Sequence, residues 1–596
     1  MKIKHFFGLA VIAAMTASCS SNEDLGTAGS GTGTNEAGVG YATFTINLPT
    51  ANGTRATTND QFDGGTDSEY AVNDATLVIF EKEGTATPEN EYKYVETVPL
   101  GNLEPWKKDN ESTNGITTEA TITAKLNSAS VGTTDKYYAL VILNNKVGTN
   151  NKVTLPTSTT TTYGEWNVAK NASLESFVNN KDGFYMANAP EFKAADQEPT
   201  TLVKIEGIYR TKEEAQSKPG TTIHVERGLA KVTVESESST KDYFAEGGAN
   251  ATGNYSSDKV QITKWALDVT NKKSFPVHVT SGLKAGITPT NPTEDQTVPA
   301  YANIWKNAEA TPGTIPATSR FVSNSTKATF KRVYWGIDPN YSKNLEDKAV
   351  CGKEFTLVKA DGSDAAWTTS TEPLYCLENT FDINHMMQGQ TTRVIFKAKY
   401  KPNGFTEGAT FYMVGKNTAI WNEKNLKDEI TAAVTKVVTS ATTANTTVDL
   451  ANTDNDITKA GNHLLALSNI SVTGVTLKQT DIDAINAKLG LKEGEGISTY
   501  QDAEAYYIAR IKHFGDDLTP WNAGDKTYGS NDLNWLGRYG VLRNNWYNLT
   551  VSSISGPGYP DVPEVKPTDP DDENFKYINV SVKILDWAKR SQKVEL

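Results

Sequence analysis

The sequence predicts a mainly β protein with a few short helices, and three observations support this prediction. Many short segments alternate between apolar and polar residues or are continuously apolar, as strands do. Thr, Asn, Gly and Ser are abundant and the aromatic residues are mostly Tyr and Trp, which is typical of strands joined by turns. Helical spacing of apolar residues occurs in few places. With 596 residues, the chain is long enough for two or more domains.

The N-terminal strand prediction is the most regular. Residues 41–48 place Ala42, Phe44, Ile46 and Leu48 on one face and polar residues on the other. The remaining predicted strands include two near-continuous apolar runs, typical of strands covered on both faces. The two apolar runs are 75–80 and 137–143, and the other predicted strands lie at 229–234, 264–269, 393–400 and 409–414.

Few helices are predicted, and those named here lie in the second half of the chain. Apolar residues spaced along 426–438 form one helical face, and shorter helices are expected at 481–489 and 502–512. A polar stretch predicts the main domain boundary near residue 240. The expected domains are therefore 56–240 and 241–556, the second with helical insertions.

The first residues are typical of an export signal. Lys2 and Lys4 precede an apolar run at 6–15, which is too short to span a membrane as a helix. Small residues then lead into Cys19, in a pattern that resembles a bacterial lipobox, although Thr16 stands where leucine is usual. We expect residues 1–18 to be a lipoprotein signal peptide, Cys19 to carry lipid and 20–40 to be a flexible tether. The alternative is an ordinary secretory signal with an incidental cysteine.

Arg55 is the first arginine of the chain, and the next is Arg210. It lies in a small, polar segment directly after the strand predicted at 41–48, where a chain is easily nicked. Cleavage by an Arg-specific protease would release residues 19–55 as a propeptide, with its strand, and leave Ala56 as the new N-terminus. The processed chain would then contain 596 − 55 = 541 residues.

The C-terminal region begins with an acidic, proline-rich linker at 557–576, expected to be extended and semi-rigid. An alternating segment comes next at 577–585, and then residues 586–596. The residues alone leave two interpretations open. The last strand either completes the protein's own sheet or is delivered to another molecule.

Charge and cysteine content limit the functions further. A net charge of −13 argues against nucleic acid as a partner, because such binding needs a basic surface. If Cys19 carries lipid, Cys351 and Cys376 are the remaining pair. An exported chain permits a disulfide between them, worth about 3 kcal/mol. Two free thiols are the alternative, and the sequence does not decide between these.

The sequence offers no catalytic residue, metal site or cofactor site. None of the six histidines has another ligand at metal-binding spacing. His385 precedes two methionines, which favours packing over metal binding. The acidic runs 454–456 and 571–573 lack the glycine and distal glutamate of an EF-hand loop and are predicted to be solvated. Trp and Tyr could stack on sugars, but in a β-rich chain they are more often core residues.

Several motifs resemble a known family. The runs at 506–515, 519–521 and 536–547 are similar to the C-terminal domain of the Bacteroidales type V fimbrillins, and most similar to the shaft subunit of the minor, or short, fimbrium. The runs at 225–232 and 375–381 also resemble that family. The run Arg-Tyr-Gly-Val-Leu-Arg-Asn-Asn-Trp-Tyr at 538–547 is the most specific of them.

The resemblance implies two transthyretin-like β-sandwich domains in tandem and a route of assembly. Such subunits reach the outer membrane as lipoproteins, and an Arg-specific, trypsin-like protease removes the first strand. A C-terminal strand of a neighbouring copy then fills the opened groove. By position, Arg55 and Ala56 flank the cut, and Ala42 to Leu48 form the removed strand. The donor strand lies within 577–596, with Trp587, Val594 and Leu596 as its candidate anchors.

The expected function is therefore that of a structural shaft subunit of a surface fimbrium that supports adhesion or colonisation. The expected partners are other copies of the chain, the protease, anchor and tip subunits, and host or bacterial surface receptors. The precursor would be a lipid-anchored outer-membrane protein. The alternative is a glycan-binding surface lipoprotein that stays anchored through Cys19. An enzymatic role is not expected.

Overall fold

The structure is a computed structural model. It describes most of the chain from the first predicted strand onward. The described residues are 39–48, 69, 71–101, 103, 119–132, 135–147, 149–169, 172–177, 183–192, 199–237, 241–280, 333–341, 343, 345–359, 367–369, 372–381, 385–450, 463–514, 537–569 and 578–586. Cys19, Arg55 and Ala56 lie outside them, as do Trp587, Val594 and Leu596. No helix within the described ranges is long and apolar enough to cross a membrane.

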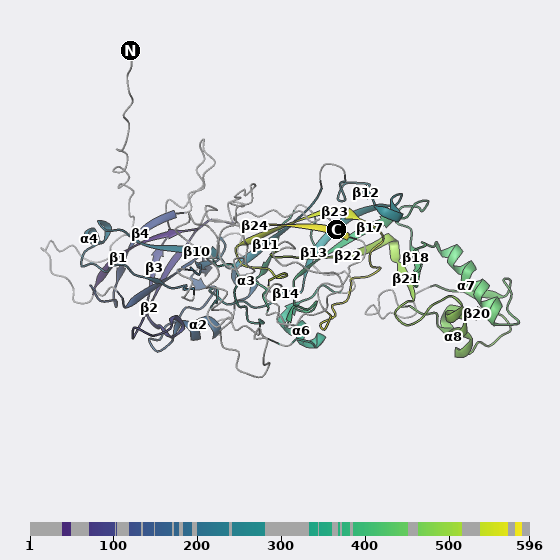
Figure 1. The fold of residues 1–596 in the computed structure, drawn as a ribbon, viewed down its shortest axis with the longest axis horizontal. Coiled ribbons are helices and arrows are strands. Elements are labelled where there is room, and N and C mark those ends of the chain that lie inside the picture. The colour runs from purple at the N-terminus through teal and green to yellow at the C-terminus, as the bar shows by residue number, and fades with distance from the viewer. Residues whose placement is uncertain are drawn as a thin grey trace, which may run out of the picture.

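The molecule is elongated, and its first half is built on one eight-stranded sheet (Figure 1). The strand order is β3-β2-β5-β8-β10-β1-β4, with β9 paired to β5. The strands are β1 (Gly40–Asn47), β2 (Ala75–Glu81), β3 (Lys93–Gly101), β4 (Glu119–Leu126), β5 (Tyr137–Leu143), β8 (Met186–Asn188), β9 (Val203–Lys204) and β10 (Thr221–Arg227).

This sheet curls around a hydrophobic core. The two end strands, β3 and β4, both contribute side chains to the same buried cluster, among them Leu100 and Leu126. Glu96 of β3 links the two ends, since its carboxylate accepts hydrogen bonds from the backbone N–H groups of Asn127, Ser128 and Ala129. The outer face of the sheet packs against α2 (Tyr163–Ala169) and α3 (Leu174–Phe177).

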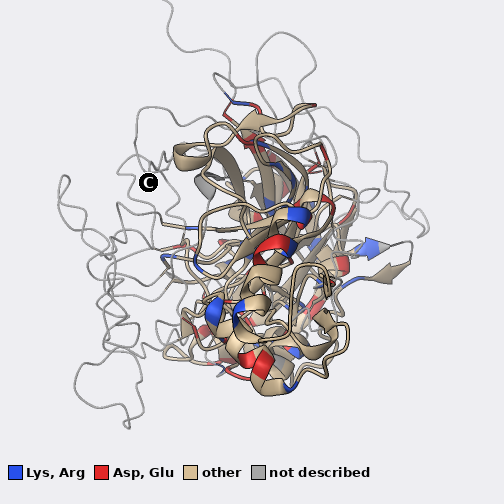
Figure 2. Ribbon diagram, turned by 90° about the vertical axis from the view of Figure 1, so that its right-hand side faces the viewer, with Lys and Arg blue, Asp and Glu red and all other residues tan. Residues whose placement is uncertain are grey.

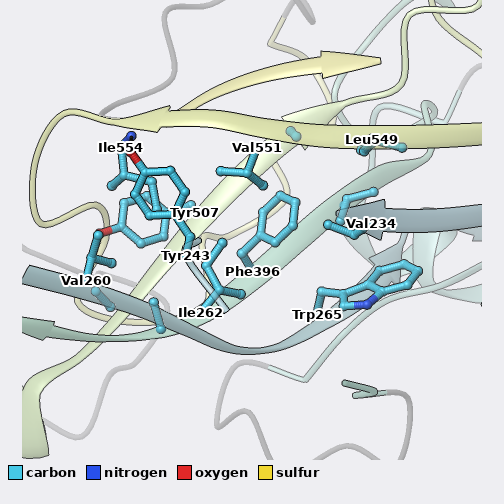
Figure 3. Packing of buried hydrophobic residues seen from close by; sticks show 14 of the residues in the cluster. Val234, Tyr243, Val260, Ile262, Trp265, Phe396, Tyr507, Leu549, Val551 and Ile554 are labelled. Atoms are coloured by element: carbon cyan, nitrogen blue, oxygen red, sulfur yellow. Dashed lines mark hydrogen bonds between the residues drawn. The ribbon is translucent and has the colours of Figure 1, made fainter. Parts of the chain in front are cut away.

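The second half is a sandwich of two four-stranded sheets. One sheet has the order β16-β11-β23-β24 and the other β12-β13-β17-β22. In Figure 3, Val551 and Leu549 of β23 point toward Phe396 and Trp265 of the facing sheet. The strands are β11 (Leu229–Ser236), β12 (Ala249–Asn250), β13 (Lys259–Asp268), β16 (Leu374–Leu377), β17 (Arg393–Lys401), β22 (Glu504–Arg510), β23 (Asn545–Ile554) and β24 (Ile578–Asp586).

A helical subdomain projects from the sandwich at the end opposite the first sheet (Figure 1). Its core joins α7 (Glu423–Val437) and α8 (Gln479–Lys488) to the hairpins β18 (Phe411–Val414) with β21 (Ile497–Tyr500), and β19 (Thr446–Val448) with β20 (Ile470–Val472). Asn422 caps α7 by accepting a hydrogen bond from the N–H of Asn425. Acidic and basic residues are interspersed along the coloured ribbon at this end of the molecule (Figure 2).

Short elements complete the described part of the chain. They are η1 (Glu89–Glu91), β6 (Lys146–Val147), β7 (Asn150–Asn151), α4 (Lys212–Gln216), η2 (Gly253–Tyr255), β14 (Thr270–Asn271), α6 (Lys348–Glu354), β15 (Phe355–Thr356), η7 (Leu467–Asn469) and η8 (Gln501–Ala503).

The predicted mainly β fold is confirmed, and every strand predicted from the sequence corresponds to a strand of the structure. The helices predicted at 426–438 and 481–489 are α7 and α8. The helix predicted at 502–512 is wrong, because most of this range forms strand β22. Ala505, Tyr507 and Ala509 alternate into the sandwich core, so the period is two residues rather than 3.6. The chain changes from the first sheet to the sandwich at Gly228, between β10 and β11, whereas the polar stretch of the sequence predicted a boundary near 240.

Candidate functional site

Strand β1 lies in the interior of the first sheet, although it comes from the N-terminal end of the described chain (Figure 1). It pairs antiparallel with β4 over its whole length, from Gly40 opposite Leu126 to Asn47 opposite Glu119. On its other side it pairs parallel with β10, from Phe44 to Asn47. Both edges of β1 are therefore hydrogen-bonded, and β10 and β4 are neighbours only through it.

The inward face of β1 is part of the core. Ala42, Phe44 and Ile46 are completely buried and Leu48 is 3% exposed, all within one hydrophobic cluster. Burial of the three larger side chains contributes on the order of 6 kcal/mol, at about 1.5–3 kcal/mol each. The four residues assigned from the sequence to the removable strand are thus brought together on one face, as the alternation predicted.

The outward face of β1 is held by polar contacts. The Thr43 hydroxyl donates a hydrogen bond to the Ala215 carbonyl oxygen of α4 at 3.0 Å and lies 2.9 Å from the Thr123 hydroxyl of β4. The Asn47 amide donates to the Glu119 carboxylate at 2.9 Å. The short helix α4 therefore covers this strand on the side away from the core.

The start of β1 is fixed by a close approach of the backbone. Tyr41 and Tyr209 exchange two backbone hydrogen bonds of 2.8 Å. At Gly40 an added Cβ would overlap the Ile208 side chain, so a larger residue does not fit without movement of Ile208. The segment around Tyr209 therefore pairs with the first residues of β1, ahead of the residues that pair with β10.

This arrangement determines what loss of β1 would do. Removal of an interior strand would leave two unpaired sheet edges, one on β10 and one on β4, on either side of an apolar slot. Unpaired backbone groups and exposed apolar side chains both favour binding of another extended segment. The site can therefore accept a strand, and its chemistry is that of main-chain hydrogen bonding with alternating apolar anchors.

Glu69 holds the segment after β1 at the junction of the two halves. Its carboxylate lies 2.8 Å from the Nζ of Lys231 on β11, and it also accepts a short hydrogen bond from the hydroxyl of Tyr375 on β16. Its carbonyl oxygen accepts a hydrogen bond of 2.7 Å from the Nε of Arg227, at the end of β10. One buried residue thus joins the last strand of the first sheet to the sandwich.

Further buried polar contacts stabilise this junction. The Arg227 guanidinium and backbone N–H both donate to the side-chain oxygen of Asn544, which precedes β23. Burial lowers the pKa of Arg227 to about 10, and the group remains protonated at neutral pH. Lys231 lies over the Trp546 ring, with its Nζ 4.0 Å from the ring centroid. The two halves are therefore tied together by the buried Glu69–Lys231 ion pair and by the hydrogen bonds of Arg227.

Strand β24 occupies the edge of the sandwich beside β23. It runs antiparallel to β23, from Ile578 opposite Ile554 to Asp586 opposite Asn545. Asp586 consequently lies at the end of the sandwich that faces the first sheet. Of the two interpretations of the C-terminal region, the structure has 578–586 in the protein's own sheet.

The two described cysteines are both free and buried. The Cys351 thiol donates to the Leu345 carbonyl oxygen, whereas Cys376 lies in the sandwich core. Burial raises the pKa of Cys351 to about 11 and that of Cys376 to about 12, which keeps both thiols protonated. The disulfide considered from the sequence is therefore not formed, and the alternative of two free thiols is observed.

Among the residues that the structure describes, no group of three or more His, Cys, Asp or Glu could hold a metal ion. His385 is partly exposed and precedes the fully buried Met386. The acidic runs 454–456 and 571–573 lie outside the described residues.

Sequence reasoning missed three parts of the site. It did not identify Glu69, which is one of several acidic residues in a polar run and has no sequence feature that indicates burial. It did not predict that α4 covers β1, nor that β10 is a parallel partner of β1. These relations join residues about 170 positions apart and leave no local pattern in the sequence.

The comparison with protein families gives one match. Residues 498–593 match the family described as major fimbrial subunit protein type IV, fimbrillin, C-terminal. The match spans β22, β23 and β24, which are strands of the sandwich described above. The C-terminal part of the chain is therefore similar to the fimbrillin C-terminal domain, and the predicted resemblance to the fimbrillins is confirmed for these residues. This is a domain of fimbrial, or pilus, subunits.

Solved structures of bacterial surface proteins show distant similarity. A Parabacteroides distasonis protein with a provisional cell-adhesion role is 12% identical, with a TM-score of 0.35, covering 93% of this chain and 99% of its own. A corresponding Bacteroides eggerthii protein is 13% identical, with a TM-score of 0.31, covering 93% and 98%. The tip fimbrial protein Mfa3 from Porphyromonas gingivalis is 10% identical, with a TM-score of 0.27, covering 92% and 100%. No sequence among curated proteins matches the chain. Scores this low carry no argument, so the functional assignment relies on the family match.

The burial of β1 leads to a first prediction. Replacing Phe44 by Ala should lower the free energy of unfolding of the uncleaved chain by about 3–5 kcal/mol, because it leaves a cavity in the core. Urea unfolding measures this change. Thr45→Ala, on the other face of the same strand, is the matched control and should cost less than about 1 kcal/mol. Equal losses from the two variants would contradict the assigned faces.

The Glu69 contacts lead to a second prediction. Glu69→Ala should destabilise the chain by about 3–5 kcal/mol, because it leaves the buried Lys231 ammonium without its carboxylate partner. Asp135→Ala, which removes an ion pair to Lys204 that is largely exposed, should cost less than about 1 kcal/mol. Thermal unfolding of both variants makes the comparison. A small effect of Glu69→Ala would mean that Glu69 does not hold the junction.

Proposed function

We propose that the chain is a structural shaft subunit of a cell-surface fimbrium that polymerises by donor-strand exchange. In this proposal Cys19 anchors the precursor to the outer membrane through lipid, and an Arg-specific protease cleaves between Arg55 and Ala56. Strand β1 leaves with the propeptide, and a C-terminal segment of the next copy takes its place. The fibre contributes to adhesion or colonisation together with anchor and tip subunits.

The interior position of β1 is the observation that carries this proposal. A strand that is paired on both sides and buried on one face leaves a complete strand-shaped slot when it is removed. The cleavage residue lies only seven positions after Leu48, so one cut separates the strand from the rest of the chain. The fimbrillin match of residues 498–593 supports the same assignment independently.

Glu69 fits this route because it holds the chain on the C-terminal side of the cut. It lies 14 positions after Arg55, and its contacts are made to β10, β11 and β16 rather than to β1. Loss of the propeptide would therefore leave the junction of the two halves bound. A head-to-tail contact of this kind does not close on itself, so it produces a filament.

The third prediction concerns the cut itself. Arg55→Ala should leave a lipid-anchored monomer and abolish polymer, because β1 then stays in its own slot. Immunoblotting of membrane and surface fractions, with N-terminal sequencing of the surface material, measures both effects. The wild-type surface material should begin at Ala56.

Arg210→Ala is the control for this experiment, since Arg210 is the next arginine of the chain and is exposed. It should process and polymerise normally. Surface material with an intact, acylated Cys19 would refute the shaft-subunit proposal and favour the anchored, glycan-binding lipoprotein.

The fourth prediction concerns the donor segment. Deleting residues 587–596 should give a folded, processed chain that does not polymerise. These ten residues span up to about 35 Å when extended, enough to cover the eight residues of β1. Unheated SDS gels, on which exchanged strands hold subunits together, measure polymer. Normal fibres from the truncated chain would exclude 587–596 as the donor.

A cysteine pair tests whether β24 also leaves its sheet. Thr550 and Ser581 face each other in the β23–β24 register, so Thr550→Cys with Ser581→Cys can fasten the two strands. Polymerisation of the oxidised pair would confine the donor to residues after Asp586. Polymerisation only after reduction would assign the donor role to β24, whose alternating Ile578, Val580, Val582 and Ile584 have the period of β1.

A further inference from the structure

The proline-rich segment before β24 is bound along the sandwich, and this has a consequence for assembly. We call residues 556–569 the strap. Its start is fixed by tyrosine side chains of β22 and β21. Tyr507 donates a hydrogen bond to the Gly556 carbonyl oxygen and Tyr500 donates one to that of Gly558, each at 2.9 Å. Tyr559 exchanges two backbone hydrogen bonds of 2.8 Å with Tyr506.

Gly558 is needed for this close approach. Its φ is +64°, a left-handed conformation that favours glycine. An added Cβ would lie 2.5 Å from the Tyr506 carbonyl oxygen and 2.6 Å from the Tyr507 ring. The strap therefore contacts β22 at backbone distance, which a solvated linker does not do.

The middle of the strap is held by a buried charge. The Arg393 guanidinium of β17 donates one hydrogen bond to the Pro563 carbonyl oxygen and another to the Asp268 carboxylate of β13, both at 2.7 Å. Both charged side chains are about 1% exposed. Val562 is buried beside them, in a cluster with Ile395 of β17. Lifting the strap would remove a partner from a buried guanidinium and expose an apolar side chain.

The end of the strap is fixed to a different part of the domain. Val565 is buried with Val269 and Phe355. Pro567 lies directly over Gly389, where an added Cβ would come within 2.7 Å of the Pro567 Cα. The N–H of Gln388 donates a hydrogen bond of 2.9 Å to the carbonyl oxygen of Asp569. The strap is thus bound at its start, middle and end.

We infer that the strap stays bound when subunits exchange strands, so that Asp569 is the fixed root of the C-terminal arm. This inference rests on the proposed donor-strand exchange and concerns where the donating arm begins. The arm that follows Asp569 contains 596 − 569 = 27 residues and reaches up to about 90 Å when extended. Release of the strap would add its 569 − 555 = 14 residues, which lengthens the arm by on the order of 50 Å.

A bound strap also determines where force enters the subunit. Once β24 has left β23 as part of the arm, tension on the donated strand would reach Asp569 first and pass through Arg393 and Tyr506 into β17 and β22. These strands lie side by side in one sheet of the sandwich, with β17 in its interior. The pull would then load several side-chain and backbone contacts together, instead of peeling β23 from the edge of the other sheet.

A reversible clamp tests the inference. Tyr506 and Tyr559 are paired in an antiparallel bridge, where Cα atoms are about 5.5 Å apart, within the range that a disulfide spans. The chain carrying Tyr506→Cys and Tyr559→Cys is oxidised, cleaved with an Arg-specific protease and followed on unheated SDS gels. The oxidised chain should polymerise within about twofold of the rate of the same chain after reduction. A clamped chain that polymerises only after reduction would overturn the inference.

Two further samples, the single-cysteine variant and the wild-type chain, show why polymer is absent when none forms. The Tyr506→Cys single variant controls for loss of the tyrosine, and thermal unfolding of each variant confirms that it is folded. Absence of polymer from the wild-type chain after cleavage would refute donor-strand exchange itself, and the strap's role as arm root with it. Failure confined to the oxidised pair refutes only the strap inference.

Hydrogen–deuterium exchange of the wild-type chain gives an answer that needs no substitution. Two backbone amides report on strap docking. The Tyr559 N–H donates to the Tyr506 carbonyl oxygen at 2.8 Å, and the Gln388 N–H donates to that of Asp569 at 2.9 Å. Both amides should be as protected in the polymer as in the monomer. Loss of their protection in the polymer would overturn the inference.

Discussion

The pairing of β1 on both of its edges is the constraint on which the first half of the molecule depends. Strands β10 and β4 are neighbours only through β1, and its Phe44 and Ile46 lie at the centre of the core that the curled sheet encloses. An edge strand could leave with limited damage, but an interior strand cannot, because its loss unpairs two neighbours at once. The same property makes the slot selective for an extended segment with apolar residues at every second position.

The junction between the two halves is held by buried charged groups, whereas the inward face of β1 is held by apolar side chains. Glu69 and Lys231 form a buried ion pair, and the buried Arg227 donates a hydrogen bond to the Glu69 carbonyl oxygen, so these contacts are costly to break and hold the sandwich to the first sheet. In the proposed exchange of the first strand, this junction is the fixed point next to the exchange site. The strap is held in a similar way near the other end of the chain. There the buried Arg393, which is paired with Asp268, donates a hydrogen bond to the Pro563 carbonyl oxygen ahead of the C-terminal strand.

Much of the fold could be predicted from the sequence because strands and helices have local periods. The alternation of 41–48 predicted β1 and the correct inward residues, and helical spacing predicted α7 and α8. The range 502–512 was misassigned because a short run of apolar and aromatic residues can fit either period, and only pairing with β17 makes it a strand. The cysteines could not be resolved from the sequence, since two thiols can pair only if the fold brings them together.

The sequence by itself determined the mainly β class and the inward face of β1, and it predicts an export signal followed by a lone arginine ahead of the globular body. Its fimbrillin-like C-terminal motifs are local runs, and the family match covers the same region. Only the tertiary structure decided that β1 is an interior strand, that Glu69 is buried, and that the proline-rich segment is bound rather than solvated. These facts depend on contacts between residues far apart in the chain. A local pattern records which face of a strand is apolar, but it does not record which neighbours the strand will have.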